Sequence, residues 1–217
     1  MHMLIGTFFV LMSLPPYPEV CQEIRSNRDQ YALLLQTVEE DAREVVYKGA
    51  GTYLRQAIVN DLVPYWLGTP WDFNGHTNVP GEGFVACGYL VSTSLKHAGF
   101  QLNRYRVAQQ DATTITKILS DTIVRFRDLG PTLRYIKSEP DELYVVGLSN
   151  HVGFLYKSGD TLDFIHSSFV DPGTVVREAA STSPVLRMTN VYVLGPLTQR
   201  RYTIDKWLRK SEFLVRR

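Results

Sequence analysis

The spacing of apolar residues changes character about two thirds of the way along the chain. Over residues 20–47 apolar positions recur at helical intervals with Arg and Glu between them, which predicts an amphipathic helix. The glycines on either side of Ala50 interrupt this pattern, a shorter helix is predicted over 52–62, and Pro64 is expected to end it. Further helices are predicted at 87–98, closed by Gly99, at 111–127 and at 131–138.

From residue 143 onward the apolar residues follow the patterns of strands. Five short runs fit: LYVVGL, HVGFLY, TLDFIHS, TVVRE and NVYVLGPL. Helices followed by a series of strands predict an α+β fold, with an antiparallel sheet packed against helices. Residues 66–85 are rich in Gly, Pro, Asn and Asp and are expected to form a loop. We expect one catalytic domain over 63–217, preceded by a helical extension over 21–62.

The N-terminal residues have the features of a targeting segment. LIGTFFVLMSL, at 4–14, is an apolar run of 11 residues, whereas a membrane helix needs roughly 20. Its length suits the core of a signal peptide, but no Lys or Arg precedes it and no small-residue cleavage site follows it. A buried N-terminal segment is the alternative. We interpret residues 1–20 as a targeting segment and expect a secreted or periplasmic protein, or a cytoplasmic one if this segment is not a signal.

Composition narrows the class of protein without naming a function. The chain has 217 residues, of which 44% are hydrophobic and 21% charged, as in ordinary soluble domains. A net charge of +1 gives no reason to expect nucleic acid or an anionic membrane as partner, and we expect a monomer without an integral membrane span. Two cysteines, Cys21 and Cys87, are too few for a disulfide framework.

Three residues suggest catalytic chemistry. Cys87 begins a predicted helix, whose free N–H groups and dipole are expected to lower its thiol pKa and to hold an oxyanion. KSGD predicts a hairpin turn centred on Ser158–Gly159, which places His151 directly opposite His166, with Cβ atoms roughly 5 Å apart. A thiol and two facing imidazoles are the nucleophile, base and orienter of a cysteine hydrolase, which needs no cofactor.

Other roles for these residues are open. A lone cysteine is often a small buried apolar residue, and single histidines are often structural. One Cys and two His are also plausible zinc ligands with water as the fourth, although the usual ligand spacing is missing. His76 and His97 are expected at the surface, and the basic tail KWLRKSEFLVRR is expected to be a terminal helix.

Several motifs between residues 65 and 166 resemble, in order, those of the NlpC-type cell-wall cysteine hydrolases, which have a compact papain-like fold. GTPWDFNG at 68–75 is similar to the opening segment of that family, and ACGY at 86–89 to its nucleophile turn. EPDEL at 139–143, HVGFLY at 151–156 and FIHSS at 164–168 are similar to its later segments. The resemblance implies a papain-like catalytic domain in which Cys87 is the nucleophile, His151 the base and His166 the orienter.

The sequence departs from that family at the residues around the nucleophile. Ala86 replaces the acidic residue that helps to hold a free substrate amine, and Gly88 replaces the following serine. Trp71 replaces a tyrosine that often assists the oxyanion, and Tyr65 and Tyr89 are candidate substitutes. Asp72 or Glu82 is a candidate replacement for the missing carboxylate.

The resemblance and the residues together predict a thiol-dependent amide or peptide hydrolase with a peptide or peptidoglycan-like substrate. An acyltransferase that uses the same thiol, and a binding module of the same fold without catalytic activity, are the alternatives.

Overall fold

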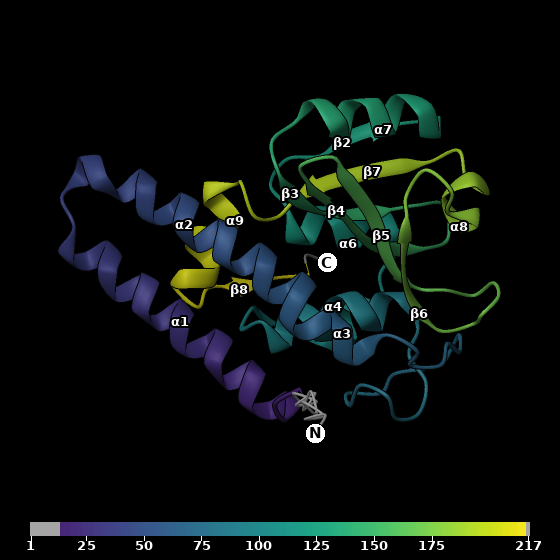
Figure 1. The fold of residues 1–217 in the computed structure, drawn as a ribbon, viewed down its shortest axis with the longest axis horizontal. Helices are drawn as coiled ribbons and strands as arrows, with labels where there is room; N and C mark the ends of the chain where they lie inside the picture. Colours follow the sequence, from purple (N-terminus) through teal and green to yellow (C-terminus); the bar gives the residue numbers. More distant parts are fainter. Residues whose placement is uncertain (1–13, 216–217) are drawn as a thin grey trace, which may run out of the picture.

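One antiparallel sheet organises the computed structural model, which describes residues 14–215 (Figure 1). Its strands lie in the order β2-β7-β3-β4-β5-β6, with every neighbouring pair antiparallel. The strands are β2 (Val124–Phe126), β3 (Glu142–Gly147), β4 (Val152–Ser158), β5 (Thr161–Ser167), β6 (Val175–Ala179) and β7 (Tyr192–Pro196). The predicted α+β class and antiparallel sheet are confirmed, and the five predicted strands correspond to β3–β7.

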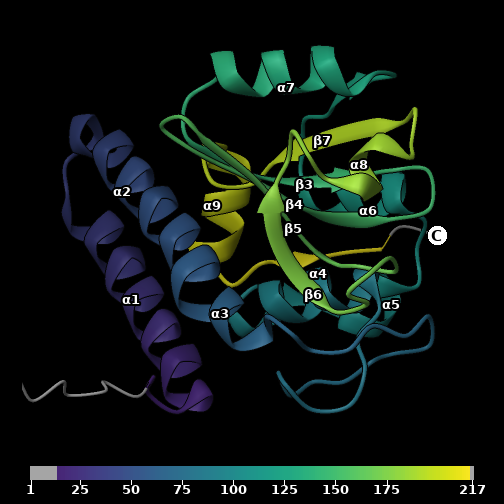
Figure 2. The ribbon, with the colours of Figure 1, turned by 45° about the vertical axis from the view of Figure 1, so that its right-hand side comes forward.

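Helices cover both faces of this sheet, as Figure 2 shows. Alternate residues of a strand point to opposite faces, so Leu143 and Val145 of β3 pack in one core while Tyr144 and Val146 pack in the other. Helices α4 (Cys87–His97) and α6 (Ala112–Leu119) contribute to the first core, and α7 (Leu129–Ser138) and α8 (Pro184–Arg187) to the second. Strand β4 is buried on both faces, which explains why HVGFLY is a continuous apolar run.

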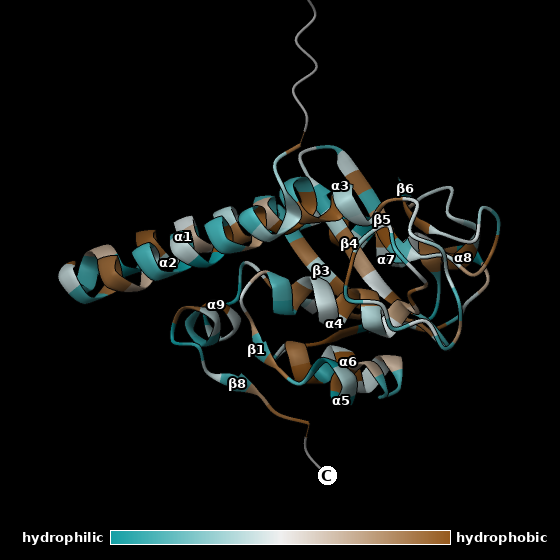
Figure 3. Ribbon diagram, turned by 90° about the horizontal axis from the view of Figure 1, so that it is seen from below, coloured by the Kyte–Doolittle hydropathy of each residue, from teal (hydrophilic) through white to brown (hydrophobic). Residues whose placement is uncertain are grey.

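The first half of the chain contains a helical hairpin that the sequence did not predict (Figure 3). The predicted single helix over 20–47 is wrong, because the backbone becomes extended at Val38 and the chain turns back. Gly51 was expected to interrupt the helical pattern, but it lies inside the second helix. A Cβ at this position would lie 2.0 Å from the Thr198 carbonyl oxygen, so the glycine is needed for this close contact. The elements are α1 (Tyr17–Thr37), a 3-10 turn (Glu40–Ala42), α2 (Arg43–Gln56), a π-helical stretch (Ala57–Leu62) and α3 (Val63–Trp66).

The remaining elements complete the fold around the C-terminus. They are β1 (Gln101–Leu102), α5 (Arg104–Ala108), α9 (Arg201–Leu208) and β8 (Glu212–Phe213). The predicted helix over 111–127 is divided into α6 and β2. Pro64 was expected to end a helix, but it occupies the first turn of α3, where no N–H is needed. The predicted terminal helix is also shorter than expected: α9 ends at Leu208, and β8 pairs in parallel with β1.

The start of α1 is anchored to the rest of the fold. The Tyr17 hydroxyl accepts from the Trp66 indole at 2.8 Å and lies 2.9 Å from His97 Nδ1, to which it donates. His97 was expected at the surface, but it is partly buried between these rings, and burial lowers its pKa to about 4. Most of the predicted targeting segment lies outside the described residues. Its last part, Tyr17–Val20, belongs to α1, so the predicted boundary at residue 20 cuts this helix.

No helix within the described part of the chain is both long enough and apolar enough to cross a membrane.

Candidate active site

Cys87 is the first residue of α4 and is held there by the loop before it. Ala86, the preceding residue, is extended and supplies no side-chain cap, so the first-turn N–H groups have no partner within the helix. The loop is fixed on two sides: the Trp71 N–H donates to the Gly173 carbonyl at 2.8 Å, and the Ser167 hydroxyl donates to the Val85 carbonyl at 2.6 Å. The thiol therefore lies at a helix N-terminus whose position the sheet determines.

The backbone of α5 explains why residue 88 is a glycine, where the NlpC-type motif has a serine. A Cβ on Gly88 would lie 2.5 Å from the carbonyl oxygen of Ala108, at the end of α5. Backbone atoms cannot move aside as a flexible side chain can, so a serine does not fit here without displacing α5.

Cys87 and His151 line the same pocket, which has a volume of about 460 Å³. The pocket opens between the start of α4, the loop before it, the end of α5 and the turn before β4. The residues that line it are Trp71, Phe73, Asn74, Ala86, Cys87, Gly88, Tyr89, Ala108, Gln109, Gln110, Asn150, His151 and Phe169. The N–H of Val152 lies close enough to the Cys87 thiol to lower its pKa, so the start of β4 contributes a donor near the sulfur and His151 to the same pocket.

A chain of hydrogen bonds continues from His151 into the sheet. His151 Nε2 lies 2.9 Å from His166 Nδ1, and His166 Nε2 lies 3.2 Å from Glu178 Oε1. His151 and His166 are buried, whereas the Glu178 side chain is partly exposed. The structure thus brings the two predicted histidines together and adds a carboxylate that the sequence did not predict.

The predicted register of the histidine hairpin is wrong by two residues. Ser158 pairs with Thr161, so the turn is Gly159–Asp160 and His151 does not lie directly opposite His166. A shift of two residues keeps every side chain on its face, so the two rings still meet diagonally. Gly153 makes room for this contact, because a Cβ there would lie 2.9 Å from the Cβ of His166.

The hydrogen bonds fix the tautomers of both histidines. A carboxylate can only accept, so His166 carries its proton on Nε2 and donates it to Glu178. Its Nδ1 is then an acceptor, and His151 must donate from Nε2. The Nδ1 of His151 is left without a proton, which is the state that a general base requires.

Burial keeps the thiol and both imidazoles neutral. Desolvation lowers the pKa of His166 to about 3, and desolvation together with the neighbouring His166 lowers that of His151 to about 3. Burial also raises the pKa of the Cys87 thiol, and the N–H groups of Val152, Gly88 and Cys87 offset this only in part. The predicted lowering of the thiol pKa is therefore not found, because desolvation outweighs the three N–H groups near the sulfur.

The other predicted site residues divide into two groups. Trp71 and Tyr89 line the pocket, and the Tyr89 hydroxyl is a weak acceptor for Gln109 at 3.4 Å. Tyr65 does not line it, because its hydroxyl donates to the Pro15 carbonyl beside α1. Asp72 does not line it either, since its carboxylate accepts from the Asn74 N–H at 2.7 Å within the loop.

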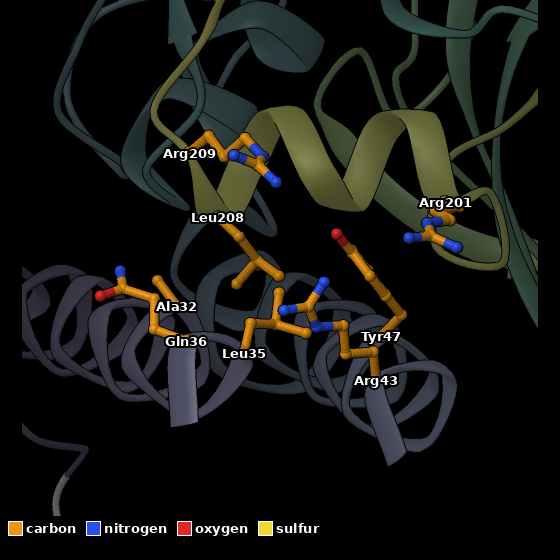
Figure 4. Close-up of a pocket in the computed structure, with 8 residues that line it drawn as sticks. All are labelled: Ala32, Leu35, Gln36, Arg43, Tyr47, Arg201, Leu208 and Arg209. Carbon is orange, nitrogen blue, oxygen red and sulfur yellow. The ribbon is translucent and has the colours of Figure 1, made fainter. Parts of the chain in front are cut away.

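A second pocket lies between α1, α2 and α9 (Figure 4). Three arginines line it, but Arg43 is paired with Glu40 and Arg209 with Asp205, while Arg201 lies over the ring of Tyr47. Its positive charge is largely compensated within the protein, and none of the residues proposed for catalysis lines it.

The zinc alternative has little support in this geometry. His151 and His166 direct ring nitrogens at each other at hydrogen-bond distance, which occupies the lone pair that His166 Nδ1 would offer to a metal. In residues 14–215 no three His, Cys, Asp or Glu side chains are grouped so that they could hold a metal ion.

Comparisons with models of protein families, with curated proteins and with solved structures find no match for this chain.

Proposed function

We propose that this protein is a thiol-dependent amide hydrolase with a papain-like arrangement of helix and sheet. The observation that carries the proposal is the hydrogen-bonded series His151–His166–Glu178, which leaves a basic nitrogen on His151 in the pocket that Cys87 lines. Among the described residues His151 Nδ1 has no hydrogen-bond partner, and it is not one of the polar atoms that are buried without a partner, so it is accessible from the pocket and available to take a proton.

The reaction starts from a neutral thiol and a neutral imidazole. As the sulfur of Cys87 attacks the scissile carbonyl, His151 Nδ1 takes the thiol proton, and the new S–C bond gives a tetrahedral oxyanion. The N–H groups at the start of α4 have no side-chain cap and are the donors that would hold this oxyanion. His151 then gives its proton to the leaving amine, the C–N bond breaks, and a thioester remains on Cys87. Water, deprotonated by His151, attacks the thioester and releases the acid and the free thiol.

Within this mechanism His166 and Glu178 are positioning residues. His166 holds the tautomer of His151, and the carboxylate of Glu178 holds the tautomer of His166. The negative charge of Glu178 also stabilises the imidazolium that forms on His151 during the reaction, through the intervening ring.

A peptide or peptidoglycan-like substrate and an exported location belong to the same proposal. Both rest on the resemblance to the NlpC-type hydrolases and on the apolar residues 4–14.

Mass spectrometry of the trapped thioester tests the function. The wild-type protein and a Cys21→Ala variant, incubated with an activated acyl ester and quenched in acid, should each gain one acyl group on Cys87. Cys21 is the matched control, because it is the only other cysteine of the chain and is buried in the core. Cys87→Ala should gain none and should not turn over a peptide-amide substrate. Equal turnover by Cys87→Ala and wild type would refute the proposal.

A further inference from the structure

We propose that the pocket beside Cys87 takes a neutral acyl group, with a hydrocarbon chain of several carbons attached to the scissile carbonyl. This inference rests on the proposed function and names its substrate class. It departs from the charged peptide ends that the family resemblance would suggest.

The pocket is lined by uncharged residues. Within the described chain, the residues that line this pocket include no Asp, Glu, Lys or Arg, and the histidine among them is held neutral. The two acids considered as replacements for a substrate-binding carboxylate, Asp72 and Glu82, both lie outside the lining. A substrate ammonium or carboxylate that entered this pocket would lose part of its hydration and would meet only neutral amide and hydroxyl groups, without a residue of opposite charge.

A wall of aromatic rings leads to the base. The ring of Trp71 lies 6.3 Å from that of Phe169, and the ring of Phe169 lies 5.3 Å from that of His151. Phe73, which also lines the pocket, is 80% exposed. Large aromatic side chains that remain in water at the edge of a pocket gain stability when a ligand covers them.

These two properties select a flexible, uncharged, apolar group. An acyl chain can lie along Trp71, Phe73 and Phe169 while its carbonyl meets Cys87, and its carbons need no hydrogen-bond partners. The same chemistry is found in an N-acylated peptide and in a lipid acyl ester, so we assign the acyl group and leave its carrier to the experiment.

The test compares chain length and charge on one scaffold. N-acetyl, N-octanoyl and N-succinyl dipeptide amides, together with the glycerol ester of octanoic acid, are assayed for kcat/KM. A fully buried methylene is worth roughly fourfold in rate, so partial burial of the additional carbons of octanoyl should favour it over acetyl by about tenfold or more. The charged succinyl amide should be slower than the octanoyl amide, and a preference for either octanoyl carrier supports the inference.

Two phenylalanines of the same loop supply the matched variants. Phe73→Ala should remove about tenfold of the preference for octanoyl over acetyl, because the longer chain loses its contact with this ring. Phe84, which is 55% exposed and does not line the pocket, is the control, and Phe84→Ala should keep the full preference.

Each failure has its own meaning. Turnover through Cys87 with equal rates on the acetyl and octanoyl amides, or with a preference for succinyl, overturns the acyl inference and leaves the hydrolase proposal intact. No acylation of Cys87 by any of these compounds or by the activated ester overturns both.

Discussion

Removal of the Glu178 carboxylate is expected to slow catalysis by changing which nitrogen of His151 carries the proton. In Glu178→Ala the Nε2 of His166 loses the acceptor that lies 3.2 Å away, so the proton of His166 is free to move to Nδ1. His151, 2.9 Å from that Nδ1, would then accept at Nε2 and carry its own proton on Nδ1. A protonated Nδ1 cannot take the proton of the Cys87 thiol.

The size of the effect follows from the exposure of the carboxylate. A hydrogen bond to a charged group contributes about 1.5–3 kcal/mol. The Glu178 side chain is 30% exposed, and water screens part of its charge, so the lower end of this range applies. About 1.5 kcal/mol corresponds to a loss of roughly tenfold in kcat/KM. Glu178→Gln keeps an acceptor oxygen without the charge and should lose less.

The assay is kcat/KM between pH 5 and 8 on the octanoyl amide. Arg177→Gln is the matched control, since Arg177 lies on the same strand, is 32% exposed and pairs with Asp163 at 2.7 Å, away from the two histidines. In the wild type the pKa of His151 is about 3, so the base stays neutral and the rate should hold from pH 7 to pH 5. Equal losses of kcat/KM in Glu178→Ala and Arg177→Gln would contradict the tautomer assignment. A fall of the wild-type rate below about pH 6.5 would contradict the lowered pKa of His151.

Two further predictions concern stability. Gly88→Ser should lower the free energy of unfolding by about 2 kcal/mol, because its Cβ would lie 2.5 Å from the Ala108 carbonyl oxygen; Gly49→Ser, whose nearest neighbour would be 3.4 Å away, should be nearly neutral in the same urea titration. His97 has a pKa lowered to about 4, so the folded protein binds fewer protons than the unfolded chain, and stability falls as the pH falls from 6.5 towards 4. By pH 5 this loss amounts to about 2 kcal/mol. His97→Gln keeps an acceptor for Tyr17 but does not titrate, so it should remove this loss. If the free energy of unfolding of His97→Gln falls between pH 7 and pH 5 as much as that of the wild type, the assignment is contradicted.

The sequence predicted the parts of the site that local patterns determine. Cys87 begins a helix where an extended residue follows a glycine-rich loop, and that boundary is visible in the residues alone. The facing of His151 and His166 depended on a hairpin register that was wrong by two residues, yet the prediction that they meet was right. An error of two residues preserves the face of a strand, whereas an error of one would have separated the rings.

Glu178 was missed because its position depends on a longer connection. Residues 168–174 join β5 to β6 without a turn motif that fixes the register, so no pairing of TVVRE with the histidine strand could be derived. In the structure Glu178 pairs with Phe164 and not with His166, and only the diagonal placement brings its carboxylate to the ring. Val176 is the residue that pairs with His166, and Glu178 lies two positions beyond it on the same face of the strand. An acidic residue on the strand next to a histidine strand is the signal that could have suggested this contact.

The helical hairpin could not be read from the same patterns, because helical periodicity continues through the turn at 38–42. Tyr65 was considered as a substitute for the tyrosine that Trp71 replaces, but α3 directs its hydroxyl to Pro15. That contact joins residues 50 positions apart in the chain, which neither spacing nor propensity specifies.

The residues proposed for catalysis and those that contact substrate are held by different parts of the molecule. Cys87 lies at the start of α4, His151 directly before β4 and His166 on β5, and both strands are in the interior of the sheet. Glu178 lies on the edge strand β6. The aromatic wall comes from loop residues, and the departures from the NlpC-type motif lie there and at the first turn of α4. A substitution in the loop can therefore change which group packs beside the carbonyl without moving the hydrogen bonds of the base. On this reasoning we expect Ala86, at the position where the NlpC-type motif has an acidic residue, to affect substrate choice and to leave the proposed chemistry of the thiol in place.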